Sequence, residues 1–221
     1  MLDGNFRKSV ETVTLPTGRW MVRIGFSADV LTFSGLVFSA ATAWMIALGH
    51  FWIAIVLLTL TGFHDLFDGP VAKASKRASQ RGAFFDSVMD RVADSLILGG
   101  VAFYLTAHGH GQLVLLPFAI LTTTYLISYQ RSKAESLGLA AKGGLMERAE
   151  RMILLGIGLL AKSIFIPVLW IMLALTAMTA AGRFWRIWQI ADSADPPMTQ
   201  AGRIHHHSSR IRRGISRPSR R

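Results

Sequence analysis

Residues 65–90 read DLFDGPVAKASKRASQRGAFFDSVMD, and this stretch places four carboxylates between two strongly apolar segments. Asp65 and Asp68 are three residues apart, and Asp86 and Asp90 are four apart, so on helices each pair projects from one face. A carboxylate beside hydrocarbon persists only when other groups compensate its charge. Two such helices packed face to face would gather four oxygen-rich ligands around a small volume. That arrangement suits a hard divalent cation such as Mg²⁺ or Mn²⁺.

The apolar residues, which are 51% of the 221, occur in three blocks. Residues 30–63 and 95–130 contain no Asp, Glu, Lys or Arg, and residues 152–182 contain only Lys162. Each block exceeds the roughly 20 residues of one membrane crossing and has polar or turn-forming residues near its middle. We therefore predict an all-α integral membrane protein with six transmembrane helices, at about residues 28–48, 51–69, 84–107, 112–133, 147–162 and 165–186.

The basic residues orient this topology. The chain has 24 Lys and Arg against 13 Asp and Glu, a formal net charge of +11, and of the 24 cations only Lys162 falls on the opposite side. This asymmetry places both termini and the acidic stretch on the cytoplasmic side of the cell membrane. A basic face of this kind favours anionic membrane lipids and phosphorylated substrates, so nucleic acid is not the expected partner.

The two flanks of the predicted membrane domain differ from it in composition. Residues 1–27 mix apolar and basic residues without a long apolar run, which predicts a cytoplasmic, interfacial amphipathic helix and not a cleavable signal peptide. Residues 28–190 form the predicted six-helix catalytic domain. Residues 191–221, rich in Arg and Ser, are expected to be a disordered cytoplasmic tail.

Glycines and cations accompany the carboxylates. Gly69 directly follows the first pair and Gly82 precedes the second, and a glycine allows a phosphate to approach the backbone closely. Lys73 and Arg81 supply positive charge nearby. Carboxylate-bound metals, glycines and cations together indicate a diphosphate site. The alternative is that the acids only pair with neighbouring cations and lock the helices together.

Asp94 extends the second acidic row by one turn beyond Asp90. It is predicted either to support the metal site, as an outer ligand or a partner of the ligands, or to form a simple ion pair with Arg91. The spacing leaves both possibilities open.

This spacing resembles the signature of the CDP-alcohol phosphotransferase family, D-x-x-D-G-x-x-A-R-x8-G-x3-D-x3-D. The residues that match it are Asp65, Asp68, Gly69, Ala72, Gly82, Asp86 and Asp90. Lys73 stands where the family has Arg, which keeps the charge but loses the planar fork. Asp29 and Thr32 lie in a weaker match to the family's P-[ND]-x-x-T, which lies near the nucleotide; Asp29 is equally suited to be a helix N-cap.

The resemblance implies a homodimeric membrane enzyme that transfers a phosphatidyl group from CDP-diacylglycerol to an alcohol and releases CMP. It implies two divalent cations, Mg²⁺ or Mn²⁺, with Asp90 also acting as general base on the acceptor hydroxyl. The metal ligands would be Asp65, Asp68, Asp86 and Asp90. The residues implied for CDP-lipid binding are Asp29, Thr32, Gly69, Ala72, Lys73 and Gly82.

A second stretch, residues 128–151, reads SYQRSKAESLGLAAKGGLMERAER. It is similar to the S-Y-x-K-x-R-A-E…E-R-x-E-R segment of actinobacterial phosphatidylinositol phosphate synthases, with Arg131 and Lys133 replacing the family's Lys and Arg. The similarity implies that the acceptor phosphate is bound by Ser128, Arg131, Lys133, Arg148 and Arg151 of this stretch and by one later arginine, Arg183. Several cations and a hydroxyl at the cytoplasmic ends of two spans also suit a phosphorylated polyol. Inositol phosphate is the first expectation and glycerol phosphate the alternative; ordinary positive-inside anchoring would also make this loop basic.

A protein of another class, a divalent-cation carrier or a non-catalytic membrane scaffold, would place its acids differently. A carrier is expected to hold acids near the middle of several spans. Here they cluster at the predicted cytoplasmic ends of two spans, which favours an enzyme.

Overall fold

The computed structural model describes residues 23, 28–74, 79–139 and 143–194, with only the backbone for residues 28, 66–70, 72–74 and 194. The predicted interfacial helix, except Arg23, and the predicted tail from residue 195 onward lie outside this part. Every regular element within it is helical. The helices are α2 (Ala28–Ala47), α3 (Phe51–Ala74), α4 (Gln80–Ala107), the short 3-10 helix η1 (Gly111–Val114), α5 (Leu115–Ser136), α6 (Arg148–Leu159) and α7 (Lys162–Ala194).

The six predicted segments are all confirmed as helices, with differences at several ends; α4, for example, begins at Gln80 and not at residue 84. α3 continues past residue 69 to Ala74, α7 continues past residue 186 to Ala194, and α6 has only 12 residues. The break between the last two helices falls at residues 160–161, so Lys162 begins α7 instead of lying in the turn.

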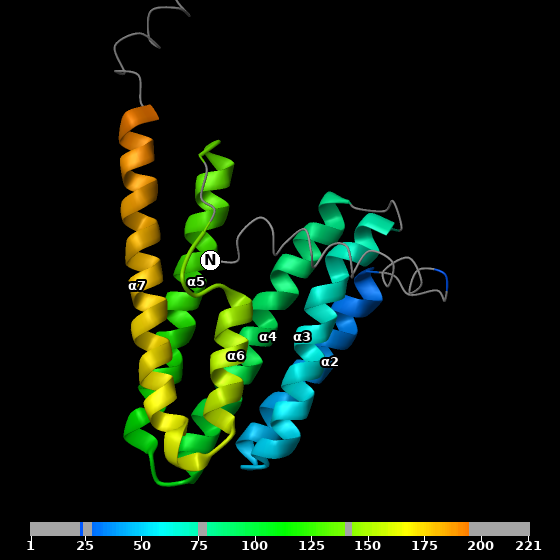
Figure 1. Ribbon diagram of the computed structural model, residues 1–221, viewed down its shortest axis with the longest axis vertical. Coiled ribbons are helices and arrows are strands. Elements are labelled where there is room, and N and C mark those ends of the chain that lie inside the picture. Colours follow the sequence, from blue (N-terminus) through cyan, green and yellow to red (C-terminus); the bar gives the residue numbers. More distant parts are fainter. Residues whose placement is uncertain (1–22, 24–27, 75–78, 140–142, 195–221) are drawn as a thin grey trace, which may run out of the picture.

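Two tight turns lie at the same end of the bundle. Gly49 joins α2 to α3 with φ of 76°, and Gly109 follows α4 with φ of 78°, a region that favours glycine. The junction between α6 and α7 lies at this end too, at the bottom of Figure 1. The ends of α3 and α5 and the start of α4 therefore lie at the opposite end of the bundle, where the acidic stretch lies.

Helix packing forms two connected groups (Figure 1). α2 packs against α3 and α4, while α5 and α6 pack against α7, and contacts of α4 with α5 and of α3 with α6 join the groups. The buried core is built near the turns, where the ring centroids of Phe51 and Tyr104 are 4.8 Å apart and those of Phe51 and Phe165 are 5.0 Å apart. The opposite end is therefore free to hold polar groups.

Several helices are apolar on their outer faces as well. In the described part, the segments Asp29–Ala47, Gly111–Ser136 and Lys162–Ser193 are long and apolar enough to cross a membrane, and Phe51–Asp65 is a shorter apolar segment. Large side chains such as Trp44, Trp52 and Trp170 are exposed on this surface. Such a surface is rare on a soluble monomer and typical of a membrane-embedded protein.

Candidate active site

Three of the four predicted metal-binding aspartates line one cavity of about 800 Å³. Asp65 comes from the second half of α3, and Asp86 and Asp90 come from the first turns of α4. Ser79 caps the start of α4, because its Oγ accepts a hydrogen bond from the backbone N–H of Gly82 at 3.0 Å. This cap fixes where the second acidic pair begins to project.

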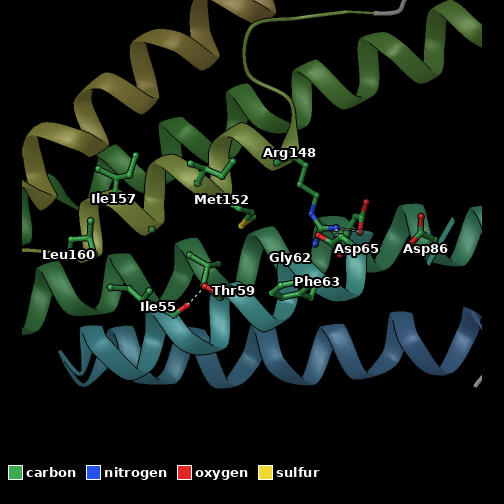
Figure 2. Close-up of a pocket in the computed structure, with 15 residues that line it drawn as sticks. Ile55, Thr59, Gly62, Phe63, Asp65, Asp86, Arg148, Met152, Ile157 and Leu160 are labelled. Atoms are coloured by element: carbon green, nitrogen blue, oxygen red, sulfur yellow. Dashed lines mark hydrogen bonds and ion pairs between the residues drawn. The ribbon is translucent and has the colours of Figure 1, made fainter. Parts of the chain in front are cut away.

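Arg148, the first residue of α6, joins the acids of α3 to those of α4. Its Nη1 lies 2.9 Å from Oδ1 of Asp65 and also donates a hydrogen bond to Oδ1 of Asp90. Figure 2 shows the Arg148 side chain reaching toward Asp65, with Asp86 farther along the cavity. Two carboxylates that are distant in the sequence thus converge on one guanidinium.

The donor set around this cavity fits a hard divalent cation, because Asp65, Asp86 and Asp90 offer only carboxylate oxygens. Among the described residues, no three His, Asp or Glu side chains already surround an ion-sized point, and the guanidinium of Arg148 stands between Asp65 and Asp90. The side chain of the fourth acid, Asp68, lies outside the described part. The same holds for the side chains of Ala72 and Lys73 and for the surroundings of Gly69.

Away from its acids, the cavity is an apolar groove between α3 and α6. It is lined there by Ile55, Leu58, Thr59, Gly62, Phe63, Met152, Ile153, Gly156, Ile157 and Leu160. Figure 2 shows Ile55, Ile157 and Leu160 at the end remote from Asp65. A molecule bound here would meet carboxylates at one end and hydrocarbon along the rest, as an amphiphile requires.

A second, smaller cavity of about 170 Å³ adjoins the acids from the other side. Residues from α4, α5, α6 and α7 and from the loop before α6 meet around it. The side chains that line it are Asp90, Arg91, Asp94, Ile127, Ser128, Arg131, Glu147, Arg148, Arg151 and Arg183. Its positive charge makes it suitable for a phosphate group.

Five of the six residues that the sequence predicts for acceptor binding lie together at this cavity. Ser128, Arg131, Arg148, Arg151 and Arg183 line it, whereas Lys133 is exposed on α5 and does not. Two of the arginines are rigidly held. Nη2 of Arg151 lies 2.8 Å from Oδ2 of Asp94, and Arg183 donates to the backbone carbonyls of Ile127 and Gly143 at 3.0 and 3.1 Å.

The structure decides between the two roles that the sequence left open for Asp94. Its side chain is buried against Arg151 and Arg148, which come from α6. Arg91 instead donates a hydrogen bond to Oγ of Ser87 at 2.8 Å, one turn earlier on α4. Of the two possibilities, the ion pair between Asp94 and Arg91 is therefore the wrong one, and Asp94 contacts arginines that border the acidic cavity.

The residues predicted near the nucleotide lie at the same end of the bundle. Oδ1 of Asp29, on α2, would be 3.9 Å from a Cβ atom placed on Gly82 of α4. Thr32, one turn further along α2, is buried. The sequence assigned no role in the site to Glu147, which occupies the N-cap position of α6 and lies 3.6 Å from Arg183. The signal was an acid immediately before a helix start.

Comparison with known proteins agrees with this geometry. A sequence model described as CDP-alcohol phosphatidyltransferase matches residues 26–191. A phosphatidylinositol phosphate synthase of Streptomyces avermitilis is 36% identical over 157 residues, which are 70% of this chain and 64% of the relative's length. An archaetidylinositol phosphate synthase of Methanothermobacter thermautotrophicus is 36% identical over 163 residues, 73% of this chain and 80% of the relative.

Solved structures share the fold. The crystal structure of Mycobacterium tuberculosis phosphatidylinositol phosphate synthase with CDP-DAG bound superposes with a TM-score of 0.74 at 25% identity, covering 84% of this chain and 98% of that one. The same enzyme in complex with manganese and citrate gives a TM-score of 0.75 at 25% identity, covering 83% and 92%. With its matched sequence, its fold and its clustered aspartates, the chain belongs to the CDP-alcohol phosphatidyltransferase family.

Proposed function

We propose that this chain transfers the phosphatidyl group of CDP-diacylglycerol to a hydroxyl of inositol phosphate and releases CMP. The observation that carries the proposal is that Asp90 and Arg148 line both cavities. The apolar groove with its acids suits a nucleotide-activated lipid, and the arginine-lined cavity suits a phosphorylated acceptor. Its position on both cavities supports a role for Asp90 between donor and acceptor. The names of the relatives support inositol phosphate as the acceptor.

Asp65, Asp86 and Asp90, together with Asp68, would hold two divalent cations, Mg²⁺ or Mn²⁺. Such ions, when bound, polarise the phosphoryl group and neutralise the charge of the departing nucleotide. A manganese-bound structure of the M. tuberculosis enzyme supports a divalent ion in this family. Gly82 would leave room for the diphosphate beside Asp29, and Gly69 would do the same next to Asp68.

In the proposed reaction, Asp90 accepts the proton of the acceptor hydroxyl. The acceptor oxygen forms a bond to the β-phosphorus of CDP-diacylglycerol, and the bond from that phosphorus to the bridging oxygen breaks. CMP leaves with the bridging oxygen. The acceptor is oriented through its phosphate, so that its hydroxyl faces the donor, by Ser128, Arg131, Arg148, Arg151 and Arg183. Holding the two reactants in this geometry raises the reaction rate.

The topology proposed with this function is a single membrane domain of six transmembrane helices, residues 28–190. Its acidic end would face the cytoplasm in the plasma membrane, with the chain acting as a homodimer. The distribution of cations along the chain supports this orientation. The position of the acids also favours an enzyme over a cation carrier. Asp65 lies in the second half of α3, and Asp86 and Asp90 lie in the first half of α4, so all three are displaced toward the end remote from the Gly49 and Gly109 turns.

The first test compares acceptors with purified protein in detergent. We expect CMP release from CDP-diacylglycerol to need Mg²⁺ or Mn²⁺ and to be fastest with inositol phosphate. Glycerol phosphate should react more slowly, and unphosphorylated inositol or serine should give only background, because neither supplies an anion for the arginine-lined cavity. Equal rates with inositol and inositol phosphate would contradict the proposed acceptor site, and faster reaction with glycerol phosphate would select the alternative acceptor.

A second test concerns the groove. Gly62 lines it, and no atom lies within 4 Å of a Cβ placed there, so the side chain of Gly62→Leu would begin in open space and fill part of the groove. We expect the KM for CDP-diacylglycerol to rise about tenfold with kcat little changed, the penalty of overfilling a binding space. Gly99 on α4 is equally open but does not line the groove, so Gly99→Leu is the matched control. An equal rise in both variants would argue against lipid binding in this groove.

A further inference from the structure

Arg148 occupies the position where carboxylates of α3 and α4 converge. One nitrogen of its guanidinium, Nη1, contacts both Asp65 and Asp90. These are two of the ligands proposed for divalent cations, so a protein side chain supplies positive charge to the same carboxylates. Two carboxylates this close repel each other unless a cation lies between them. Arg148 therefore neutralises both carboxylates, and it would compete with a metal ion for the same oxygens.

On its other side, the Arg148 guanidinium faces a carboxylate oxygen of Asp94 without forming a hydrogen bond to it. Nε of Arg148 and Oδ1 of Asp94 lie 3.6 Å apart, and both are buried atoms without a hydrogen-bond partner in the described part of the chain. The second oxygen of Asp94 is fixed by Arg151, and only 6% of the Asp94 side chain is exposed. Buried polar atoms that face each other just beyond bonding distance are costly, and a small movement of Arg148 would satisfy both.

Arg148 also lines two cavities, namely the groove that contains the acids and the arginine-lined cavity. We infer that Arg148 is an exchangeable counter-ion that couples metal loading to acceptor binding. Without a divalent cation it neutralises Asp65 and Asp90. When those carboxylates bind a cation, Arg148 releases them, closes its Nε contact with Asp94 and presents its terminal nitrogens to the acceptor phosphate. Asp94 is the positioning residue for this movement.

This inference rests on the proposed function for the identity of the metal ligands and of the acceptor anion. It has a thermodynamic consequence that needs no turnover. If metal binding frees Arg148 for an anion, then an anion that binds Arg148 must tighten metal binding by the same factor. Metal and anion affinities therefore report on the switch directly.

The experiment measures Mn²⁺ affinity in detergent from the spin-resonance signal of the free ion, with and without sulfate as a probe of the acceptor site. In the absence of sulfate, Arg148→Gln should bind Mn²⁺ about tenfold more tightly than the original protein, because it removes the competing cation. Sulfate should tighten Mn²⁺ binding severalfold in the original protein and have no such effect in Arg148→Gln or Asp94→Asn. A merely structural role of Asp94 would not remove this coupling.

Arg131→Gln is the matched control. Arg131 lines the same arginine-lined cavity but pairs with Glu135 at 3.0 Å. Arg131→Gln therefore removes an equal charge without affecting a contact to Asp65 or Asp90. An equal gain in Mn²⁺ affinity in both variants, or no gain in Arg148→Gln, would overturn the inference. If the substituted proteins do not fold, the original protein alone still tests the inference. A Mn²⁺ affinity of the original protein that does not change with sulfate would also overturn the inference. Failure of CMP release with intact coupling would instead count against the proposed function alone.

Discussion

Asp90→Asn should lower the rate of CMP release by about a thousandfold or more at saturating substrates, the scale expected when a positioned general base is lost. Among the proposed metal ligands whose side chains the structure describes, Asp90 is the one that borders both the groove and the arginine-lined cavity. Asparagine has nearly the same shape, so packing against Arg148 is retained while the negative charge and the proton-accepting oxygen are lost. The substitution therefore removes chemistry and leaves the fold.

The matched control for this prediction is Asp192→Asn. Asp192 is exposed near the end of α7, so the substitution makes the same change in charge far from either cavity. We expect its turnover to equal that of the original protein. The thermal unfolding of both variants in detergent should be measured beside their activity, to separate catalysis from stability. Full turnover by folded Asp90→Asn would show that another group accepts the hydroxyl proton.

Most of the fold follows from local patterns that the sequence displays openly. Long stretches without charge have one stable solution in a membrane, because a helix satisfies its own backbone hydrogen bonds. Glycines such as Gly49 and Gly109 then mark the hairpin turns. The convergence of Asp65 with Asp90 follows from helical spacing and from the expectation that neighbouring spans pack together.

The position of Arg148 could not be predicted in the same way. A basic residue at the start of an apolar helix satisfies the positive-inside rule wherever it lies on the cytoplasmic face. Its contact with Asp65 and Asp90 depends on α6 packing against α3, a tertiary contact between segments distant in the sequence. The partner of Asp94 was missed for the same reason. Arg91 is close to Asp94 in the chain, but Arg151 from α6 is its partner in space.

The second large effect is structural and concerns the crossing of α2 and α4. Gly100 is buried, and a Cβ atom placed there would overlap the backbone oxygen of Ala43 and lie 2.8 Å from its Cα. These are backbone atoms of a packed helix, so no change of side-chain rotamer can relieve the overlap. Small residues allow such close approach of membrane helices. Gly100→Ala must therefore push the two helices apart.

We expect Gly100→Ala to destabilise the protein by about 2–3 kcal/mol, the upper part of the range for overpacking a close contact. Gly99 provides an internal comparison, since it is the preceding residue of the same helix and no atom lies within 4 Å of a Cβ placed there. Gly99→Ala should unfold at the temperature of the original protein or slightly above it, because alanine favours a helix over glycine. Thermal denaturation of both variants in one detergent measures the difference.

The displacement should also reach the active site, which gives the prediction a second measurement. α2 carries Asp29, whose carboxylate lies beside Gly82 at the start of α4. Forcing α2 away from α4 at Gly100 would widen this approach, so Gly100→Ala should raise the KM for CDP-diacylglycerol below its unfolding temperature while Gly99→Ala should not. Identical stability and identical KM in the two variants would mean that α2 and α4 do not meet backbone to backbone at Gly100.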